Sequence, residues 1–182
     1  MSKSLLISDA NILIDIIAAG LTKEMFSLQY DFAVPVLLFE QELKENHGHL
    51  VKSGLNLIDM EAEHAKRIET LGKQYNGVSA FDLMALTLAE EKEAPLLTGD
   101  RKLRQVCMAE NIEVYGTLWL IEQMLIEKKI EVSQVETAYK KMEEDGSRLP
   151  WDEVEKQLKR LPAGKYDCID AGGRMTHETK SR

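Results

Sequence analysis

Along the first two-thirds of the chain, short apolar runs alternate with longer stretches in which apolar residues recur every three or four positions. The short runs predict strands at 4–8, 31–34, 94–98 and 112–115, and alternating apolar residues predict a short edge strand at 55–60. The longer stretches predict helices with one buried face at 11–20, 23–29, 37–46, 61–75, 100–111 and 117–128, with one more helix capped by Ser79. Strands that alternate with helices in this way predict an α/β fold with a parallel sheet covered by helices.

The last third of the chain has no strand pattern. Residues 132–144 predict a helix, and Pro150 introduces a second helix whose apolar residues recur at intervals of three or four. The segment 162–182 has no periodicity and is expected to be flexible. We therefore expect a core in 1–130, a helical appendage in 131–161 and a flexible tail in 162–182.

Composition limits the classes of partner and location. The chain has 182 residues and a net charge of −8, from 31 acidic against 23 basic side chains, so diffuse attraction to phosphates cannot supply nucleic-acid affinity. Such binding would need a local basic patch or metal ions.

The two cysteines, Cys107 and Cys168, have no disulfide or zinc spacing. The N-terminal apolar run is too short for a signal peptide, and no run approaches the roughly 20 apolar residues of a membrane span. We expect a soluble, cytoplasmic protein.

Three aspartates stand where a parallel sheet places its ligands. Asp9 and Asp100 each follow a predicted strand, and Asp82 lies in the first turn of the helix capped by Ser79. Ligands of open parallel sheets bind beyond the carboxyl ends of the strands, where the strand order reverses. We expect these acids to converge there with a glutamate near position 40, either Glu40 or Glu42.

Carboxylates brought together in this way repel one another, and a hard divalent cation such as Mg²⁺ or Mn²⁺ removes that cost. Such an ion would polarise a phosphoryl oxygen and activate water, which predicts phosphodiester hydrolysis. Each acid also has a structural explanation. Asp9 and Asp100 suit helix N-caps, and Asp82 suits the positive end of a helix dipole. Taken singly, each residue leaves both interpretations open, and the combination favours the metal site.

Four motifs, in this order, resemble those of PIN domains: DANILID, VPVLLFEQEL, SAFDLMALTLAEEKEAPLLTGDRKLR and YGTLWLIEQM. The resemblance covers about residues 4–128, and the third motif is the most specific. It implies a three-layer α/β fold with a parallel sheet, in which four acids bind Mg²⁺ or Mn²⁺ and cut RNA. The implied acids are Asp9, Glu42, Asp82 and Asp100, with Asn11 and Thr98 as supporting polar residues. Glu40 is the alternative to Glu42, which is favoured because an apolar residue follows it.

The resemblance further implies an endoribonuclease that uses metal-activated water and leaves a 3′-hydroxyl and a 5′-phosphate. It also implies a homodimer and the toxin half of a toxin–antitoxin pair. Arg101 and Arg104, beside Asp100, are candidates to contact phosphate or RNA. One alternative is an inactive scaffold of the same fold that acts through protein contacts. The other is a haloacid-dehalogenase-like phosphatase, which is disfavoured because that reaction needs an aspartate where Asn11 stands.

Overall fold

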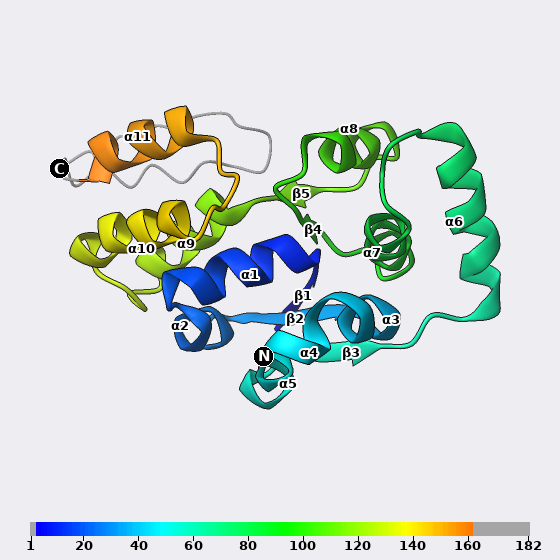
Figure 1. Cartoon of the computed structure of the whole chain (residues 1–182), viewed down its shortest axis with the longest axis horizontal. Coiled ribbons are helices and arrows are strands. Elements are labelled where there is room, and N and C mark those ends of the chain that lie inside the picture. The colour runs from blue at the N-terminus through cyan, green and yellow to red at the C-terminus, as the bar shows by residue number, and fades with distance from the viewer. Residues whose placement is uncertain (1–2, 162–182) are drawn as a thin grey trace, which may run out of the picture.

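The computed structural model describes residues 3–161 and contains a five-stranded sheet in which all strands run parallel (Figure 1). The strands, in chain order, are β1 (Ser4–Ser8), β2 (Tyr30–Pro35), β3 (Asn56–Ile58), β4 (Leu96–Leu97) and β5 (Val114–Tyr115). All five predicted strands are present, and the α/β class is confirmed. The segment 162–182, expected to be flexible, lies outside the described residues, as does Cys168.

The central strand β1 marks the point where the strand order reverses. The order is β3-β2-β1-β4-β5, so the chain moves outward from β1 on one side and then returns to its other side. Asp9 directly follows β1, and its backbone N–H donates to the carbonyl of Leu97 in β4 at 3.0 Å. The first predicted acid therefore lies at the switch point, where sheets of this kind bind their ligands.

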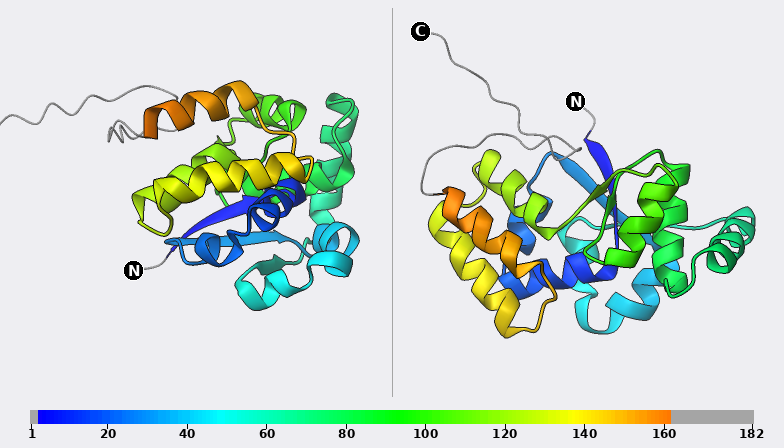
Figure 2. Two further views of the ribbon diagram at one scale, coloured as in Figure 1. Left: turned by 60° about the vertical axis from the view of Figure 1, so that its left-hand side comes forward. Right: turned by 90° about the horizontal axis from the view of Figure 1, so that it is seen from above.

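Helices cover both faces of the sheet, on opposite sides of the strands (Figure 2). One group packs together and consists of α1 (Ala10–Ala19), α2 (Thr22–Phe26) and α9 (Thr117–Ile126). The other group is centred on α7, which contacts β1, β2 and β4, and consists of α6 (Ala62–Gln74), α7 (Ala80–Glu91) and α8 (Arg101–Ala109). These layers confirm the three-layer architecture.

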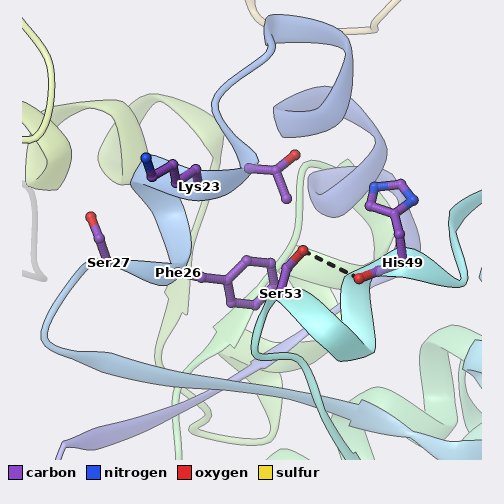
Figure 3. A pocket seen from close by; sticks show the side chains of 6 residues that line it. Lys23, Phe26, Ser27, His49 and Ser53 are labelled. Carbon is purple, nitrogen blue, oxygen red and sulfur yellow. Dashed lines mark hydrogen bonds between the residues drawn. The ribbon is translucent and has the colours of Figure 1, made fainter.

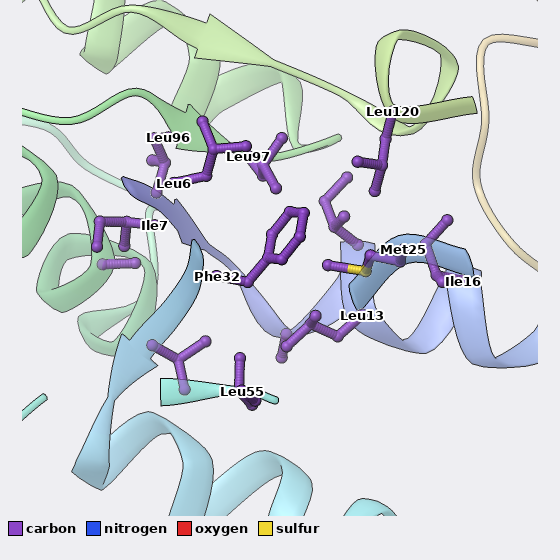
Figure 4. Packing of buried hydrophobic residues seen from close by; sticks show 14 of the residues in the cluster. Leu6, Ile7, Leu13, Ile16, Met25, Phe32, Leu55, Leu96, Leu97 and Leu120 are labelled. Atoms are coloured by element: carbon purple, nitrogen blue, oxygen red, sulfur yellow. The ribbon is translucent and has the colours of Figure 1, made fainter. Parts of the chain in front are cut away.

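The core fills the space between the sheet and these helices (Figure 4). Phe32 of β2 is completely buried. At most 1% of the surface is exposed in three of its companions in the core, Leu6 of β1, Leu13 of α1 and Leu97 of β4. Strands buried on both faces read as continuous apolar runs, which is why the sequence revealed them. Each such side chain contributes roughly 1.5–3 kcal/mol through its removal from water.

The C-terminal helices are α10 (Val132–Glu144) and α11 (Trp151–Arg160). They lie together at one end of the molecule, with α6 at the opposite end (Figures 1 and 2). α10 packs along α1, and its Val135, Tyr139 and Met142 join the same hydrophobic core. Gln157 of α11 donates from Nε2 to the carbonyl of Leu118 in α9 at 3.1 Å. No helix within residues 3–161 is long and apolar enough to cross a membrane.

The connection between β2 and β3 differs from the single helix predicted over 37–46. It is broken into α3 (Val36–Leu38), a π-helix η1 (Phe39–Leu43), α4 (Lys44–His47) and α5 (His49–Ser53). The backbone N–H of Lys44 donates to the carbonyl of Phe39, five residues back, and this wider turn alters the angles between side chains. An apolar pattern with intervals of three and four cannot distinguish such a turn from an α-helix.

Two glycine substitutions test the helix boundaries. Gly20 ends α1 with φ 73°, a left-handed conformation that costs an L-residue roughly 1–2 kcal/mol, so Gly20→Ala should lower the free energy of unfolding by that amount. Gly72 lies inside α6, and a Cβ there would meet Leu83 Cδ1 at an ordinary 3.6 Å. Gly72→Ala should raise stability by roughly 0.5–1 kcal/mol. Urea unfolding monitored by circular dichroism measures the free energy of unfolding of both variants. Equal changes in the two variants would contradict the end of α1 at Gly20 and the helical position of Gly72.

Candidate functional site

Asp9 is the most buried ionisable group of the site, with no exposed surface. It caps α1, because its Oδ1 accepts from the backbone N–H of Ile12 at 2.9 Å. Its other oxygen, Oδ2, is buried without a hydrogen-bond partner. Burial raises the pKa of Asp9 to about 7, with a further increase from the charge of Asp82, while Thr98 and the Ile12 N–H lower it. A buried oxygen without a partner is costly, so it calls for a ligand.

The charge of Asp82 acts on two other acids. It is half-buried in the first turn of α7, where the Ser79 hydroxyl donates to its Oδ2 at 2.7 Å. The same hydroxyl accepts from the Asp82 backbone N–H at 3.1 Å, which confirms Ser79 as the N-cap. The charge of Asp82 raises the pKa of both Asp9 and Glu42. Asp82 is therefore within electrostatic reach of both Asp9 and Glu42.

The two candidate glutamates occupy different surroundings. Partial burial, and secondarily the charge of Asp82, raise the pKa of the Glu42 carboxyl. Glu40 is exposed and forms an ion pair with Lys44, one turn along, at 3.2 Å. Both side chains are exposed, and the difference is that the charge of Asp82 acts on Glu42, whereas Glu40 is paired with Lys44.

Asp100 is joined to Asp9 by a threonine rather than by direct contact. It caps α8, because its Oδ1 accepts from the Leu103 N–H at 2.7 Å. Its own backbone N–H donates to the hydroxyl of Thr98 at 3.0 Å. Thr98 is fully buried, and its side chain acts on the pKa of Asp9. Thr98, predicted as a supporting polar residue, thus bonds to Asp100 and lowers the pKa of Asp9, while Asn11 is exposed on the first turn of α1.

The two arginines proposed for phosphate contact are placed differently. Arg101 is exposed at the first position of α8. Arg104, one turn later, is half-buried, and its Nη1 donates to the carbonyls of Thr98 at 2.9 Å and Tyr115 at 3.2 Å. Its nearest partners are thus the backbone ends of β4 and β5.

A fifth acid, Asp15, was not among the predicted site residues. It is half-buried on α1, where its Oδ2 accepts from the Thr117 hydroxyl at 3.2 Å. Burial raises its pKa, and its charge in turn contributes to the raised pKa of Asp9. The sequence signal was an acid within the apolar run NILIDIIAA, four residues after Asn11 and so on the same face of the helix.

The donor set suits a hard divalent cation by its chemistry, since it consists of carboxylates with one buried oxygen left unpaired. Within residues 3–161, no three His, Cys, Asp or Glu side chains lie close enough together to hold a metal ion in the arrangement seen. A separate hollow of about 370 Å³ lies between α2 and α5 and is lined by Thr22, Lys23, Phe26, Ser27, His49 and Ser53 (Figure 3). It contains no carboxylate and lies at the far end of α1 from Asp9, so it is distinct from the acidic site.

Comparison with known proteins gives the family. A family model described as a PIN domain matches residues 5–162. The crystal structure of PAE2754 from Pyrobaculum aerophilum is similar in fold, with a TM-score of 0.50 and 14% sequence identity, over 69% of this chain and 98% of that one. Among curated proteins, none matches. The family match leaves the haloacid-dehalogenase-like alternative without support. Because the family model spans most of the sequence, the chain belongs to the PIN-domain family, and this membership indicates a nuclease-type function.

Proposed function

We propose that this protein is a divalent-metal-dependent endoribonuclease that hydrolyses RNA phosphodiester bonds. Asp9, Glu42, Asp82 and Asp100 would hold Mg²⁺ or Mn²⁺ at the carboxyl ends of β1 and β4. The observation that carries the proposal is the buried, unpaired Oδ2 of Asp9, whose pKa is raised further by the charge of a second carboxylate, Asp82. Folding places two negative groups where water cannot solvate one of them, and a cation offsets that cost.

The protein's own contribution is to hold the oxygens in fixed orientations. The Ile12 N–H orients Asp9, the Ser79 hydroxyl orients Asp82, and the Leu103 N–H orients Asp100. These hydrogen bonds leave one oxygen of each aspartate for the cation, as outer-shell partners of metal ligands do. When bound, a divalent cation supplies Lewis-acid polarisation of a phosphoryl oxygen and increases the acidity of water.

The substrate would be recognised mainly through its phosphates. Arg101 is exposed immediately after Asp100 and offers a planar set of donors to a phosphate near the acids. A local contact of this kind is needed because the net charge of −8 repels RNA at long range. Asn11, exposed at the start of α1, is a second polar group at this edge of the sheet.

The proposal extends to the biological setting that the family resemblance implies. We expect an antitoxin partner that restrains the nuclease, and a homodimer as the assembly. The competing hypothesis is an inactive scaffold of the same fold. It gives no reason for a buried, unpaired carboxylate beside a second one, because an apolar pair of similar size would be more stable.

Replacing the central acid tests the enzyme. Asp82→Asn should lower the rate of RNA cleavage in Mn²⁺ by roughly 100-fold or more, since it removes a charge from the proposed cation site. Asp31→Asn is the matched control, because Asp31 is exposed at the amino end of β2, away from the site. Cleavage of a fluorescent RNA oligonucleotide measures both variants. Equal activity in the wild type and Asp82→Asn would contradict the proposed site. If the wild type neither cleaves RNA nor binds Mn²⁺, the result would support the hypothesis of an inactive scaffold.

The choice of glutamate has its own test. Glu42→Gln should weaken Mn²⁺ binding by about tenfold, because it removes a carboxylate that interacts with Asp82. Glu40→Gln should leave binding unchanged and cost only the exposed Lys44 pair, worth about 0.5 kcal/mol or less. Isothermal titration calorimetry with MnCl₂ compares the two. A loss confined to Glu40→Gln would reverse the assignment.

The buried carboxyl of Asp9 predicts a pH dependence of stability. Its pKa rises from 3.8 to about 7 on folding, so between these pH values the folded chain binds this proton more tightly than the unfolded chain does. Ionisation of Asp9 therefore lowers the free energy of unfolding as the pH rises across that interval. Asp9→Asn keeps the helix cap but carries no charge. Without divalent cations, it should be more stable than the wild type at pH 8, by on the order of 2–4 kcal/mol, with the difference vanishing near pH 4. Urea unfolding at both pH values measures this, and a pH-independent difference would contradict it.

A further inference from the structure

We infer that Arg104 is a positioning residue that ties the carboxyl ends of β4 and β5 together and thereby fixes Asp100 relative to Asp9. This inference rests on the proposed function, because it assigns Arg104 a part in shaping the proposed cation site. It also gives Arg104 a role other than the phosphate contact suggested by its position in the sequence.

The contacts of the guanidinium carry the inference. Nη1 of Arg104 donates to the carbonyls of Thr98 at 2.9 Å and Tyr115 at 3.2 Å. Tyr115 is the last residue of β5, and Thr98 directly follows β4. One side-chain nitrogen therefore links two neighbouring strands at the edge of the sheet where the acids lie.

Both proposed ligands from the sheet are connected to this link through Thr98. The Thr98 hydroxyl accepts from the backbone N–H of Asp100 at 3.0 Å, and the same side chain acts on buried Asp9. The backbone N–H of Arg104 also donates to the carbonyl of Asp100 at 2.9 Å. A shift of Thr98 would therefore change the spacing of the two aspartates.

The strands alone give this edge little rigidity. β4 and β5 have two residues each, and their ladder includes the bonds from Leu96 N–H to the Glu113 carbonyl and from Thr98 N–H to the Tyr115 carbonyl. The Arg104 bonds extend the connection beyond this ladder. They are charge-assisted and half-buried, so they are stronger than the same contacts would be in water.

Gly116 lies within van der Waals reach of the guanidinium. A Cβ at this position would lie 3.4 Å from Nη1 of Arg104 and 3.6 Å from the Thr98 carbonyl, which are ordinary contact distances. The Arg104 guanidinium is thus half-buried against the start of α9, whereas Arg101 is exposed to solvent.

The test compares Arg104→Met with Arg101→Met, since methionine keeps an unbranched apolar stem and removes the donors. Calorimetry with MnCl₂ should show that Arg104→Met weakens Mn²⁺ binding by about tenfold, the size of an outer-shell effect, with KM for an RNA oligonucleotide unchanged. Arg101→Met should instead raise KM and leave Mn²⁺ binding as in the wild type. An Arg104→Met protein that binds Mn²⁺ normally but has a raised KM would overturn the inference in favour of a phosphate contact.

Amide hydrogen exchange without metal separates this inference from the nuclease proposal. In Arg104→Met, protection of the Thr98 and Asp100 amides should fall, while that of Ile7, bonded to the Pro95 carbonyl, should not change. Unchanged protection at Thr98 and Asp100 would overturn the positioning role. Absence of Mn²⁺ binding by the wild type would overturn only the nuclease proposal. If Arg104→Met does not fold, Arg104→Gln, whose shorter side chain cannot reach both carbonyls, should show the same loss of protection, and full protection there would overturn the inference.

Discussion

The buried carboxyl group of Asp9 constrains the whole carboxyl edge of the sheet. A charge without exposed surface and with one unpaired oxygen is among the most expensive features a small domain can carry. It is placed after the central strand, with β2 and β4 on either side and helices above and below. The surrounding groups reduce the cost only in part, through the Ile12 N–H and Thr98. The positions of the other proposed ligands can be understood relative to this buried carboxyl group.

The four proposed ligands form two pairs, according to the structural elements that hold them. Asp9 and Asp100 follow adjacent parallel strands and are held by backbone hydrogen bonds and Thr98, so their positions depend on the sheet. Asp82 and Glu42 belong to α7 and to the π-helix η1, which approach the sheet from its carboxyl edge. A small displacement of η1 would change the position of Glu42 without disturbing the sheet. π-Helical turns are frequent at functional sites, and η1 is placed consistently with that tendency.

The sequence predicted the fold well because its signals are local. The buried strands are continuous apolar runs, and Ser79, Asp9 and Asp100 are caps that the structure contains as predicted. The site was harder to predict. Spacing from Pro35 could not separate Glu40 from Glu42, and the wider turn of η1, which changes the angle between them, leaves no signal in the sequence. The contacts of Arg104 and Asp15 could not be predicted, because their partners, Tyr115 and Thr117, are brought to them only by the tertiary structure.

The position of β4 between β1 and β5 has a consequence for how the protein is made. β4 pairs with a strand about 90 residues earlier in the chain, so this contact closes a long loop and forms late during folding. A ribosome that has synthesised residues 1–90 has already incorporated Asp9, Glu42 and Asp82, but not the strand whose Leu97 carbonyl anchors Asp9. The acidic site therefore cannot assemble on a nascent or truncated chain that ends before β4. Any activity of this edge of the sheet begins only when the second half of the domain has been translated.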